Sequence, residues 1–176
     1  DKRSIAYRRR KMAQTKGTTV MIELIKEAIE FGIQAKYVLF DTWFSNPAQI
    51  SDVYKLGLNT IAMIKKSEKR KYSFWGNMMT INQIFRTMPK KLGRSSYLLS
   101  VHVMTGPRCD IPAKIVFVRN RNNRKDWIAL ISTDVTLSEE EIIQAKMQKY
   151  SRIIFSCSAW SPYSKGGLGC SGCGKF

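Results

Sequence analysis

Asp41 stands at a position where a carboxylate could do chemistry, because it directly follows the apolar run 37–40. Such an unbroken apolar run predicts a strand buried on both faces, as in a parallel sheet. Asn46 and Pro47 then fit the N-cap and the first position of a helix. The pattern places Asp41 at the carboxyl end of a central strand, where open α/β sheets gather functional groups. The other interpretation is a carboxylate that caps the turn or the helix behind it.

Aromatic residues offer a second kind of chemistry, which is stacking against nucleobases. Trp43 lies two residues after Asp41, where it could stack on a base or pack into the core. Tyr72, Phe74 and Trp75 follow a basic run and could either grip an extruded base or form a small core. The sequence leaves both pairs of interpretations open.

Metal chemistry through cysteine is the weaker candidate. Cys170 and Cys173 have the spacing of half a zinc site, but a structural site needs four ligands. The remaining donors are Cys157, Cys109 and His102, and no second pair has this spacing. A stray pair of cysteines is therefore favoured over a zinc site, and His102, within a β-like run, is expected to be a packed or edge residue.

The charge of the chain points to polyanionic partners. Thirty Lys and Arg residues against thirteen Asp and Glu residues give a net charge of +17. Such a field attracts nucleic acid first and an anionic membrane surface second. No apolar run approaches the roughly 18 residues that a membrane-spanning helix needs. Four clustered cysteines do not form a secreted disulfide framework, so we expect an intracellular protein.

Two groups of basic residues are candidates for phosphate contact. The leader Arg8, Arg9, Arg10 and Lys11 is either a solvated arm or a phosphate-binding segment. The second group is expected to bind the DNA backbone without reading sequence. Its members are Lys65, Lys66, Lys69, Arg70, Lys71, Lys90, Lys91, Arg94, Arg119, Arg121, Arg124 and Lys125.

The first part of the chain has to position Asp41. Apolar residues spaced three and four apart predict a helix capped by Thr18 or Thr19 and ending near Phe31, with Gly32 just past its end. A second helix is predicted over 47–56, with Ile50, Val53 and Tyr54 on its inner face and Gly57 as its stop, and a strand over 60–64. The order helix, strand, helix, strand predicts a parallel, right-handed unit.

The pattern changes after the charged linker 65–71. Three β-like runs, 97–104, 114–119 and 127–132, follow with turns between them and predict a mainly antiparallel insertion over about 67–135. Ser138 and Glu141 then have the spacing of a capping box at the start of a helix. No Asp or Glu follows Glu141, and 151–176 shows no period of either element type, which is typical of an irregular tail.

Several separated blocks resemble DDE transposases of the insertion sequence 4 family, which are bacterial cut-and-paste transposases. The blocks are 32–45, which ends in Asp-Thr-Trp-Phe-Ser, then 114–119, and the run from Ala129 through Asp134 to Ile143. The likeness covers about residues 1–145. It implies DNA strand cleavage and transfer during transposition, by a cytoplasmic, nucleoid-associated enzyme that can act as a homodimer on DNA. No membrane contact is implied.

The fold implied by the resemblance is α/β, a ribonuclease-H-like core with a β-rich antiparallel insertion. We divide the chain accordingly into a partial core with a basic arm (1–66), the insertion (67–135), the start of the final core helix (136–150) and an irregular tail (151–176). The alternative for function is a basic nucleic-acid-binding module without catalysis.

The resemblance also implies a metal centre. In this family two aspartates and a glutamate hold two Mg²⁺ (or Mn²⁺) ions, which neutralise charge at the attacking and leaving oxygens. Asp41 matches the second aspartate, as catalytic residue and metal ligand, and the first is expected upstream of Asp1. Counting the glutamate motif from Tyr150 leads to Cys157, and counting from Arg152 leads to Ser156. Neither is a carboxylate, as a frame shift near Lys146 would explain, so we expect this chain alone not to catalyse transposition.

Overall fold

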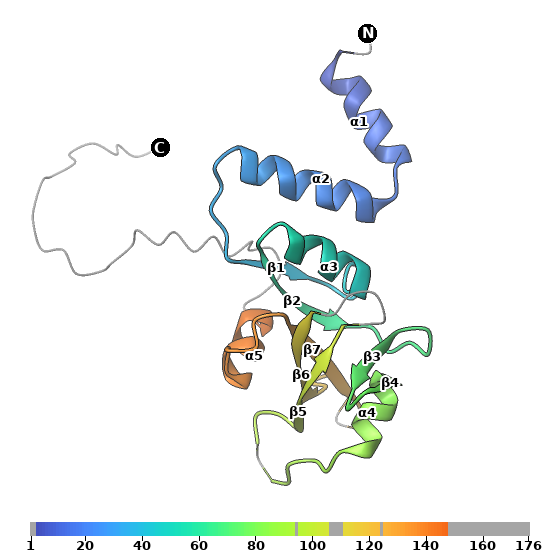
Figure 1. Ribbon diagram of the computed structural model, residues 1–176, viewed down its shortest axis with the longest axis vertical. Coiled ribbons are helices and arrows are strands. Elements are labelled where there is room, and N and C mark those ends of the chain that lie inside the picture. Colours follow the sequence, from blue (N-terminus) through green and yellow to red (C-terminus); the bar gives the residue numbers. More distant parts are fainter. Residues whose placement is uncertain (1–2, 94, 106–110, 124, 148–176) are drawn as a thin grey trace, which may run out of the picture.

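The computed structural model describes residues 3–93, 95–105, 111–123 and 125–147. In this part of the chain, five helices accompany a sheet of seven strands, which makes the structure mixed α/β, as predicted (Figure 1). The elements in chain order are α1 (Ile5–Gln14), α2 (Gly17–Glu30), β1 (Tyr37–Phe40), α3 (Pro47–Lys55), β2 (Asn59–Ile64), β3 (Lys71–Phe74), β4 (Asn77–Thr80), α4 (Ile81–Thr87), β5 (Leu99–Met104), β6 (Pro112–Arg119), β7 (Trp127–Ser132) and α5 (Glu139–Met147).

The strands pair in the order β1-β2-β7-β6-β5-β3-β4. β1 and β2 are parallel, with Val38 opposite Thr60, which confirms the predicted parallel pair. The other pairings are antiparallel, as predicted for the three later strands. β7 lies between β2 and β6, so strands from the ranges 1–66 and 67–135 share one sheet.

β1 corrects one prediction, because it is not a central strand. Among the described residues it pairs with β2 alone and forms one edge of the sheet. Phe40 is buried, while the three preceding residues are half-buried. An apolar run indicates that the side chains are buried, but it does not indicate whether the strand has one or two neighbouring strands. Here α2 supplies part of the cover, since Met21 and Ile25 pack against the cluster that contains Phe40.

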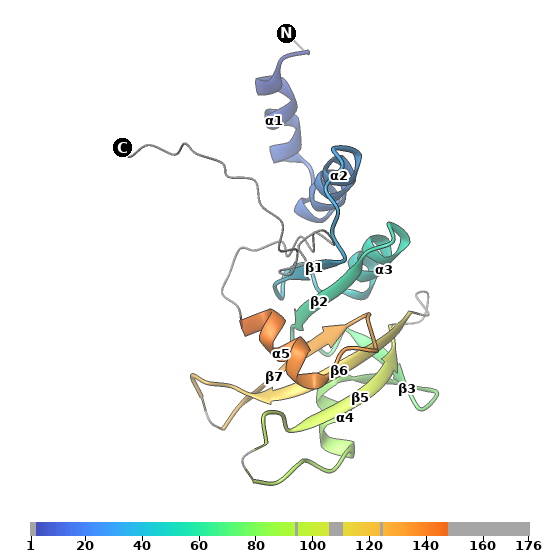
Figure 2. The same cartoon turned by 90° about the vertical axis from the view of Figure 1, so that its left-hand side faces the viewer.

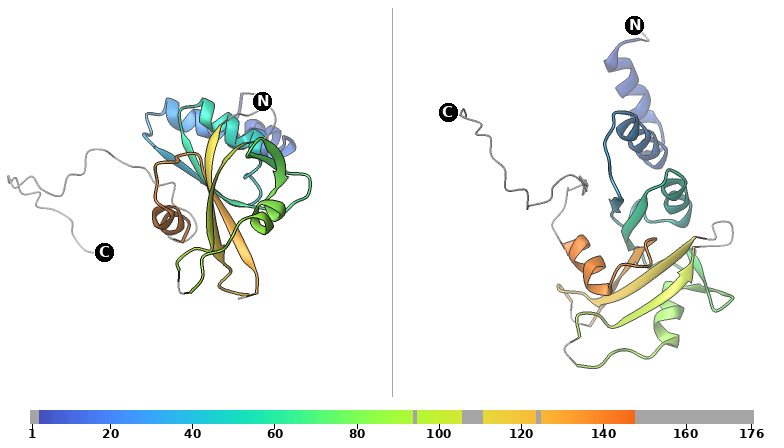
Figure 3. Two further views of the ribbon diagram at one scale, coloured as in Figure 1. Left: turned by 60° about the horizontal axis from the view of Figure 1, so that its bottom comes forward. Right: turned by 60° about the vertical axis from the view of Figure 1, so that its left-hand side comes forward.

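The core lies on both faces of the sheet. Successive side chains of a strand point to opposite faces, and on β6 Phe117 joins one buried cluster while Val116 joins the other. The first cluster includes Ile84 of α4 and the second includes Ile142 of α5. Figures 2 and 3 show α5 on one side of the sheet and α4 on the other. Full burial of one such side chain contributes about 1.5–3 kcal/mol.

Local signals fix two of the helix starts as predicted. Asn46 Oδ1 accepts the Gln49 N–H at 3.1 Å, and Pro47 occupies the first turn of α3. Ser138 Oγ accepts the Glu141 N–H at 3.2 Å, while Glu141 Oε2 accepts the Ser138 N–H at 2.8 Å. Both the N-cap of α3 and the capping box of α5 are therefore confirmed.

Other local predictions were wrong at the level of single residues. α2 starts at Gly17 with Lys16 at its N-cap and no side-chain cap, so neither Thr18 nor Thr19 caps it. Tyr54, predicted on the inner face of α3, is 43% exposed, whereas Ile50 and Val53 are fully buried there. Gly32 and Gly57, each with φ of +79°, do follow the ends of α2 and α3 in the left-handed conformation that favours glycine.

Four elements, α1, β3, β4 and α4, had no predicted counterpart. The basic leader forms the helix α1, on which Arg9, Arg10 and Lys11 are exposed. β3 and β4 form a tight hairpin around Trp75 and Gly76, which leads directly into α4. Within the described residues, no helix combines the length and the apolar composition needed to cross a membrane.

Candidate nucleic-acid interface

The turn that follows β1 holds Asp41 at the surface. The Phe44 N–H donates to the Asp41 carbonyl at 3.2 Å, which closes a four-residue turn. The Thr42 N–H donates to Asp41 Oδ1 at 2.7 Å, so the carboxylate contacts the backbone of its own turn. Asp41 is exposed and lies at the carboxyl end of β1, as predicted, although it also makes the turn-stabilising contact of the alternative interpretation.

The same turn directs Trp43 into solvent. Its side chain is 76% exposed, whereas the ring of the next residue, Phe44, lies 6.2 Å from that of Phe40 in the core. The ammonium of Lys65, just past the end of β2, lies 5.6 Å from the centroid of the Trp43 ring. Packing of Trp43 into the core is therefore excluded, and a lysine from the neighbouring strand stands over the indole.

Arg70 is joined to this turn through a buried serine. Ser45 is fully buried, and its hydroxyl donates to the Thr42 carbonyl at 3.1 Å. The same oxygen accepts a hydrogen bond from Arg70 Nη1 at 3.4 Å. The carboxyl ends of β1 and β2 thus gather one acid, one exposed indole and two of the predicted phosphate-binding cations.

Lys146 is a further cation at this place, and no sequence pattern predicts it. Its ammonium donates to the Phe40 carbonyl at 2.8 Å, which is the oxygen of the peptide group that precedes Asp41. Burial lowers the pKa of Lys146, although the charge of Asp41 acts to raise it. The contact joins residues 106 positions apart in the chain, so that the last turn of α5 lies beside the end of β1.

The end of β2 lies beside the turn that joins β6 to β7. Because Ile64 pairs with Ala129, the start of β7 lies beside the end of β2. There Lys66 forms an ion pair with Asp126 and lies 4.1 Å from the centroid of the Trp127 ring. The hydrogen bond from Lys66 is the main reason why the pKa of Asp126 is lowered.

Other predicted contacts lie at this end of the sheet or farther away. Arg119, at the end of β6, donates to the Gly93 carbonyl at 3.0 Å, and Arg121 is exposed in the turn that follows. Trp75 is 72% exposed at the tip of the β3–β4 hairpin, where its ring stacks on Phe74 at 4.6 Å. Lys69 is exposed in the loop between β2 and β3, and Lys71 is exposed at the start of β3. Arg124, Arg94 and the side chain of Arg8 lie outside the described part of the structure.

A groove next to the turn 41–44 is lined by residues of α1, α2 and the turn itself. Its volume is about 870 Å³, and Ala13 of α1, Leu24 of α2, Phe44 and Asp41 are among its lining residues. The lining is mainly apolar, so this groove is not suited to binding phosphate.

Tyr72 and Phe74 are buried, which supports the core interpretation for these two aromatic residues.

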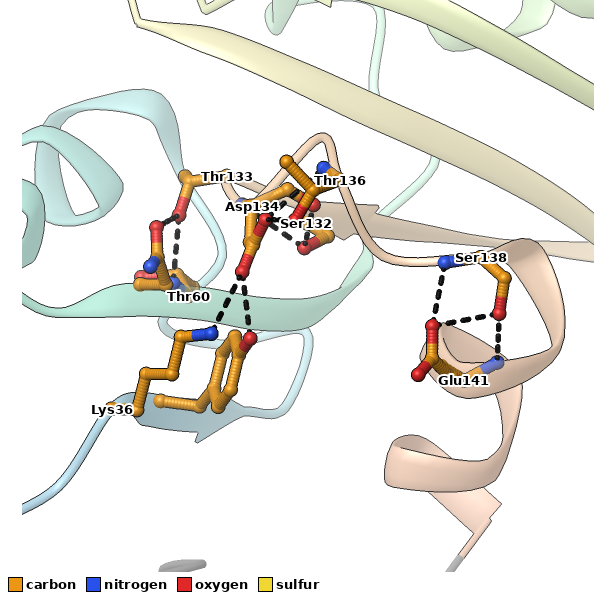
Figure 4. A network of polar contacts seen from close by, with 10 residues as sticks. Lys36, Thr60, Ser132, Thr133, Asp134, Thr136, Ser138 and Glu141 are labelled. Atoms are coloured by element: carbon orange, nitrogen blue, oxygen red, sulfur yellow. Dashed lines mark hydrogen bonds and ion pairs between the residues drawn. The ribbon is translucent and has the colours of Figure 1, made fainter. Parts of the chain in front are cut away.

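The carboxylates do not assemble into a metal centre in the described part of the chain. Asp134 accepts a hydrogen bond from the Tyr37 hydroxyl at 2.6 Å and lies 3.6 Å from the Lys36 ammonium, near the start of β1 and thus away from Asp41 (Figure 4). Glu141 is engaged in the capping box of α5. Among the described residues, no group of three or more His, Cys, Asp or Glu side chains could hold a metal ion.

The two-metal centre that the family resemblance implies is therefore not matched by these residues, which supply Asp41 alone. Tyr150, Arg152, Ser156, Cys157 and the pair Cys170 and Cys173 lie outside the described residues. Comparisons of the chain with protein-family models, with curated proteins and with solved structures find no significant match. The resemblance to insertion sequence 4 transposases stays a prediction from the residues.

Proposed function

We propose that the chain is part of a DNA transposase of the insertion sequence 4 type and that it contacts DNA through the Asp41 end of the sheet. We use this name for the turn 41–45 together with Lys65, Arg70 and Lys146. The observation that carries the proposal is a convergence at the carboxyl end of β1. Lys65 lies over the exposed Trp43 ring, Arg70 donates to Ser45, and Lys146 donates to the Phe40 carbonyl. The resemblance supplies the reaction class.

The charges suit the phosphate backbone of DNA. Each phosphate that a Lys or Arg neutralises releases condensed counterions, so that binding weakens with salt by about 0.9 log units of affinity per log unit of salt. Lys65, Lys66 and Arg121 are all exposed near the ends of β2 and β6. We expect affinity for duplex DNA in the micromolar range or weaker, with little sequence preference, since such contacts carry no base information.

No catalytic step is assigned to the described residues. In the complete family enzyme, Mg²⁺ would supply charge neutralisation on the transferring phosphate. Mg²⁺ requires several oxygen ligands in octahedral geometry, and one carboxylate does not provide them. The expected behaviour of this chain is therefore DNA binding without cleavage.

A non-catalytic nucleic-acid-binding module is the second candidate. It is favoured by the environment of Asp41, whose carboxylate already accepts the Thr42 N–H and lies in the field of the Lys146 ammonium. In this function Asp41 stabilises a turn that presents Trp43 and the surrounding cations.

Fluorescence anisotropy titrations of a labelled duplex at several salt concentrations test the interface. The double variant Lys65→Ala/Arg70→Ala should bind more weakly and lower the salt slope by about 1.8, since two contacts are lost. The control Lys26→Ala/Lys55→Ala removes the same charge from exposed positions on α2 and α3 and should change the slope much less. Equal effects of the two double variants would overturn the proposed interface.

A nicking assay on supercoiled plasmid with Mg²⁺ or Mn²⁺ separates the two functions. Neither the chain nor its Asp41→Ala variant should nick DNA. Asp52→Ala, at an exposed position on α3, is the control for loss of one carboxylate. Metal-dependent nicking that Asp41→Ala abolishes and Asp52→Ala preserves would contradict this expectation and assign catalysis to the chain itself.

A further inference from the structure

Trp43 differs from the other tryptophans of the described residues in that its ring packs against no aromatic side chain. Trp127 packs against Phe85 at 4.5 Å and Phe117 at 5.2 Å, and Trp75 stacks on Phe74 at 4.6 Å. Among the described residues, Trp43 is the tryptophan without an aromatic neighbour, and it is 76% exposed. A side chain that usually buries 150–250 Å² is thus held open to a ligand.

The cations around Trp43 define the chemistry of that ligand. The Lys65 ammonium lies 5.6 Å from the ring centroid, and Arg70 is fixed at the base of the turn through Ser45. Lys146 is fixed next to Asp41 through its bond to the Phe40 carbonyl. An exposed indole flanked by positive charges suits a flat aromatic group that carries an anion, which is the composition of a nucleotide.

The bases of a duplex are already stacked on both faces, so they offer no free ring to an indole. An unpaired nucleotide does offer one, and stacking of a base on an aromatic side chain tolerates any sequence. The adjoining phosphates of a single strand can then reach the cations that surround the ring.

We propose that Trp43 and Lys65 form a stacking site for an unpaired nucleotide, so that the Asp41 end of the sheet prefers single-stranded DNA to a fully paired duplex. This inference rests on the proposed DNA interface and adds the class of DNA that it takes. Trp43 supplies the stacking surface, and Lys65 supplies a cation both to the ring face and to the neighbouring phosphate.

The test uses the full chain with two fluorescent probes, an oligo(dT) strand of roughly 12 nucleotides and a blunt duplex of the same length. Trp43→Ala should weaken oligo(dT) binding about 5- to 100-fold, as expected for the loss of one stacked base, and should leave duplex binding within about twofold. Phe31→Ala, which removes an exposed aromatic ring at the end of α2, is the matched control and should change neither. Trp43→Phe should restore part of the oligo(dT) affinity.

The outcomes separate this inference from the proposed function. Equal loss of both probes in Trp43→Ala, or no loss of either, would overturn the stacking site while leaving the DNA interface in place. Failure of the unmodified chain to bind either probe would overturn both. Circular dichroism of each variant checks that the fold is intact. We expect no change in the spectrum, because the Trp43 side chain is exposed.

Discussion

Replacing Tyr37 with phenylalanine removes one hydroxyl from the network that joins β1 to the connection between β7 and α5. The Tyr37 hydroxyl donates to Asp134 Oδ2 at 2.6 Å, and the Thr136 N–H and hydroxyl donate to Oδ1 at 3.1 and 2.5 Å (Figure 4). The Lys36 ammonium lies 3.6 Å from Oδ2. The Asp134 side chain is 9% exposed, so water replaces a lost donor poorly.

The size of the effect follows from these contacts. A hydrogen bond to a charged acceptor contributes about 1.5–3 kcal/mol, and the remaining Lys36 ammonium compensates for part of its loss. We therefore expect Tyr37→Phe to lower the free energy of unfolding by about 1–2 kcal/mol at pH 7. For a chain of this size the melting temperature should fall by roughly 2–8 °C.

The loss should depend on pH. Burial acts to raise the pKa of Asp134, but hydrogen bonds from Thr136 and Tyr37, with the charge of Lys36, outweigh it and lower the pKa below its ordinary value. A carboxyl group with a lowered pKa in the folded state stabilises the fold fully above its unfolded pKa of about 3.9, and this stabilisation is lost as pH falls through the lower folded value. The effect of Tyr37→Phe should therefore be complete at pH 7 and shrink as pH falls below about 3.9.

Urea unfolding followed by circular dichroism at a series of pH values measures this. Tyr54→Phe is the control, because Tyr54 is 43% exposed on α3, and its effect should stay within about 0.5 kcal/mol. A Tyr37→Phe effect as small as that of the control, or one that does not shrink as pH falls below about 3.9, would refute the role assigned to Asp134.

Three more predictions concern single side chains. Tyr72→Phe should raise the free energy of unfolding by about 1 kcal/mol in urea titrations, because the buried Tyr72 hydroxyl has no hydrogen-bond partner among the described residues; the same burial raises its pKa to about 12. A decrease would reveal a partner. Asp41→Asn should bind duplex DNA several-fold more tightly without divalent metal, since a negative charge leaves the phosphate-binding surface; anisotropy titration in EDTA measures this, and weaker binding would contradict it. Lys146→Met should weaken duplex binding and lower the salt slope by about 0.9, and an unchanged slope would exclude Lys146 from the interface.

The parts of the fold that follow from local chemistry were predictable. Asn46 before Pro47, and Ser138 three residues before Glu141, fix helix starts through contacts within one turn, and both were found as predicted. The parallel pairing of β1 with β2 follows from the helix between them.

Pairing between distant segments was not predictable from these patterns. The place of β7 between β2 and β6, and the edge position of β1, depend on which strands meet after collapse, and no local spacing encodes that choice. The same limit applies to the site. Asp41 and its basic neighbours were found by residue type, but the bond from Lys146 to the Phe40 carbonyl joins segments 106 residues apart and has no motif.

The exposure of Trp43 was also beyond the sequence, because a tryptophan after an apolar strand can either continue the core or leave it. The turn decides, since closing it between Asp41 and Phe44 packs the half-buried Phe44 against Phe40 and turns the preceding side chain outward. Sequence patterns found the groups that could bind DNA, and the fold selects which of them share one surface.

Lysine footprinting on the DNA-bound chain tests the central claim most directly. The full chain is acetylated by a small reagent, free and with saturating duplex, and the modified lysines are identified by mass spectrometry. Lys65 and Lys66 should be protected by DNA, whereas Lys26 of α2 and Lys55 of α3, which are also exposed, should react equally in both samples. Protection of Lys26 and Lys55 without protection of Lys65 and Lys66 would contradict the DNA interface at the Asp41 end of the sheet.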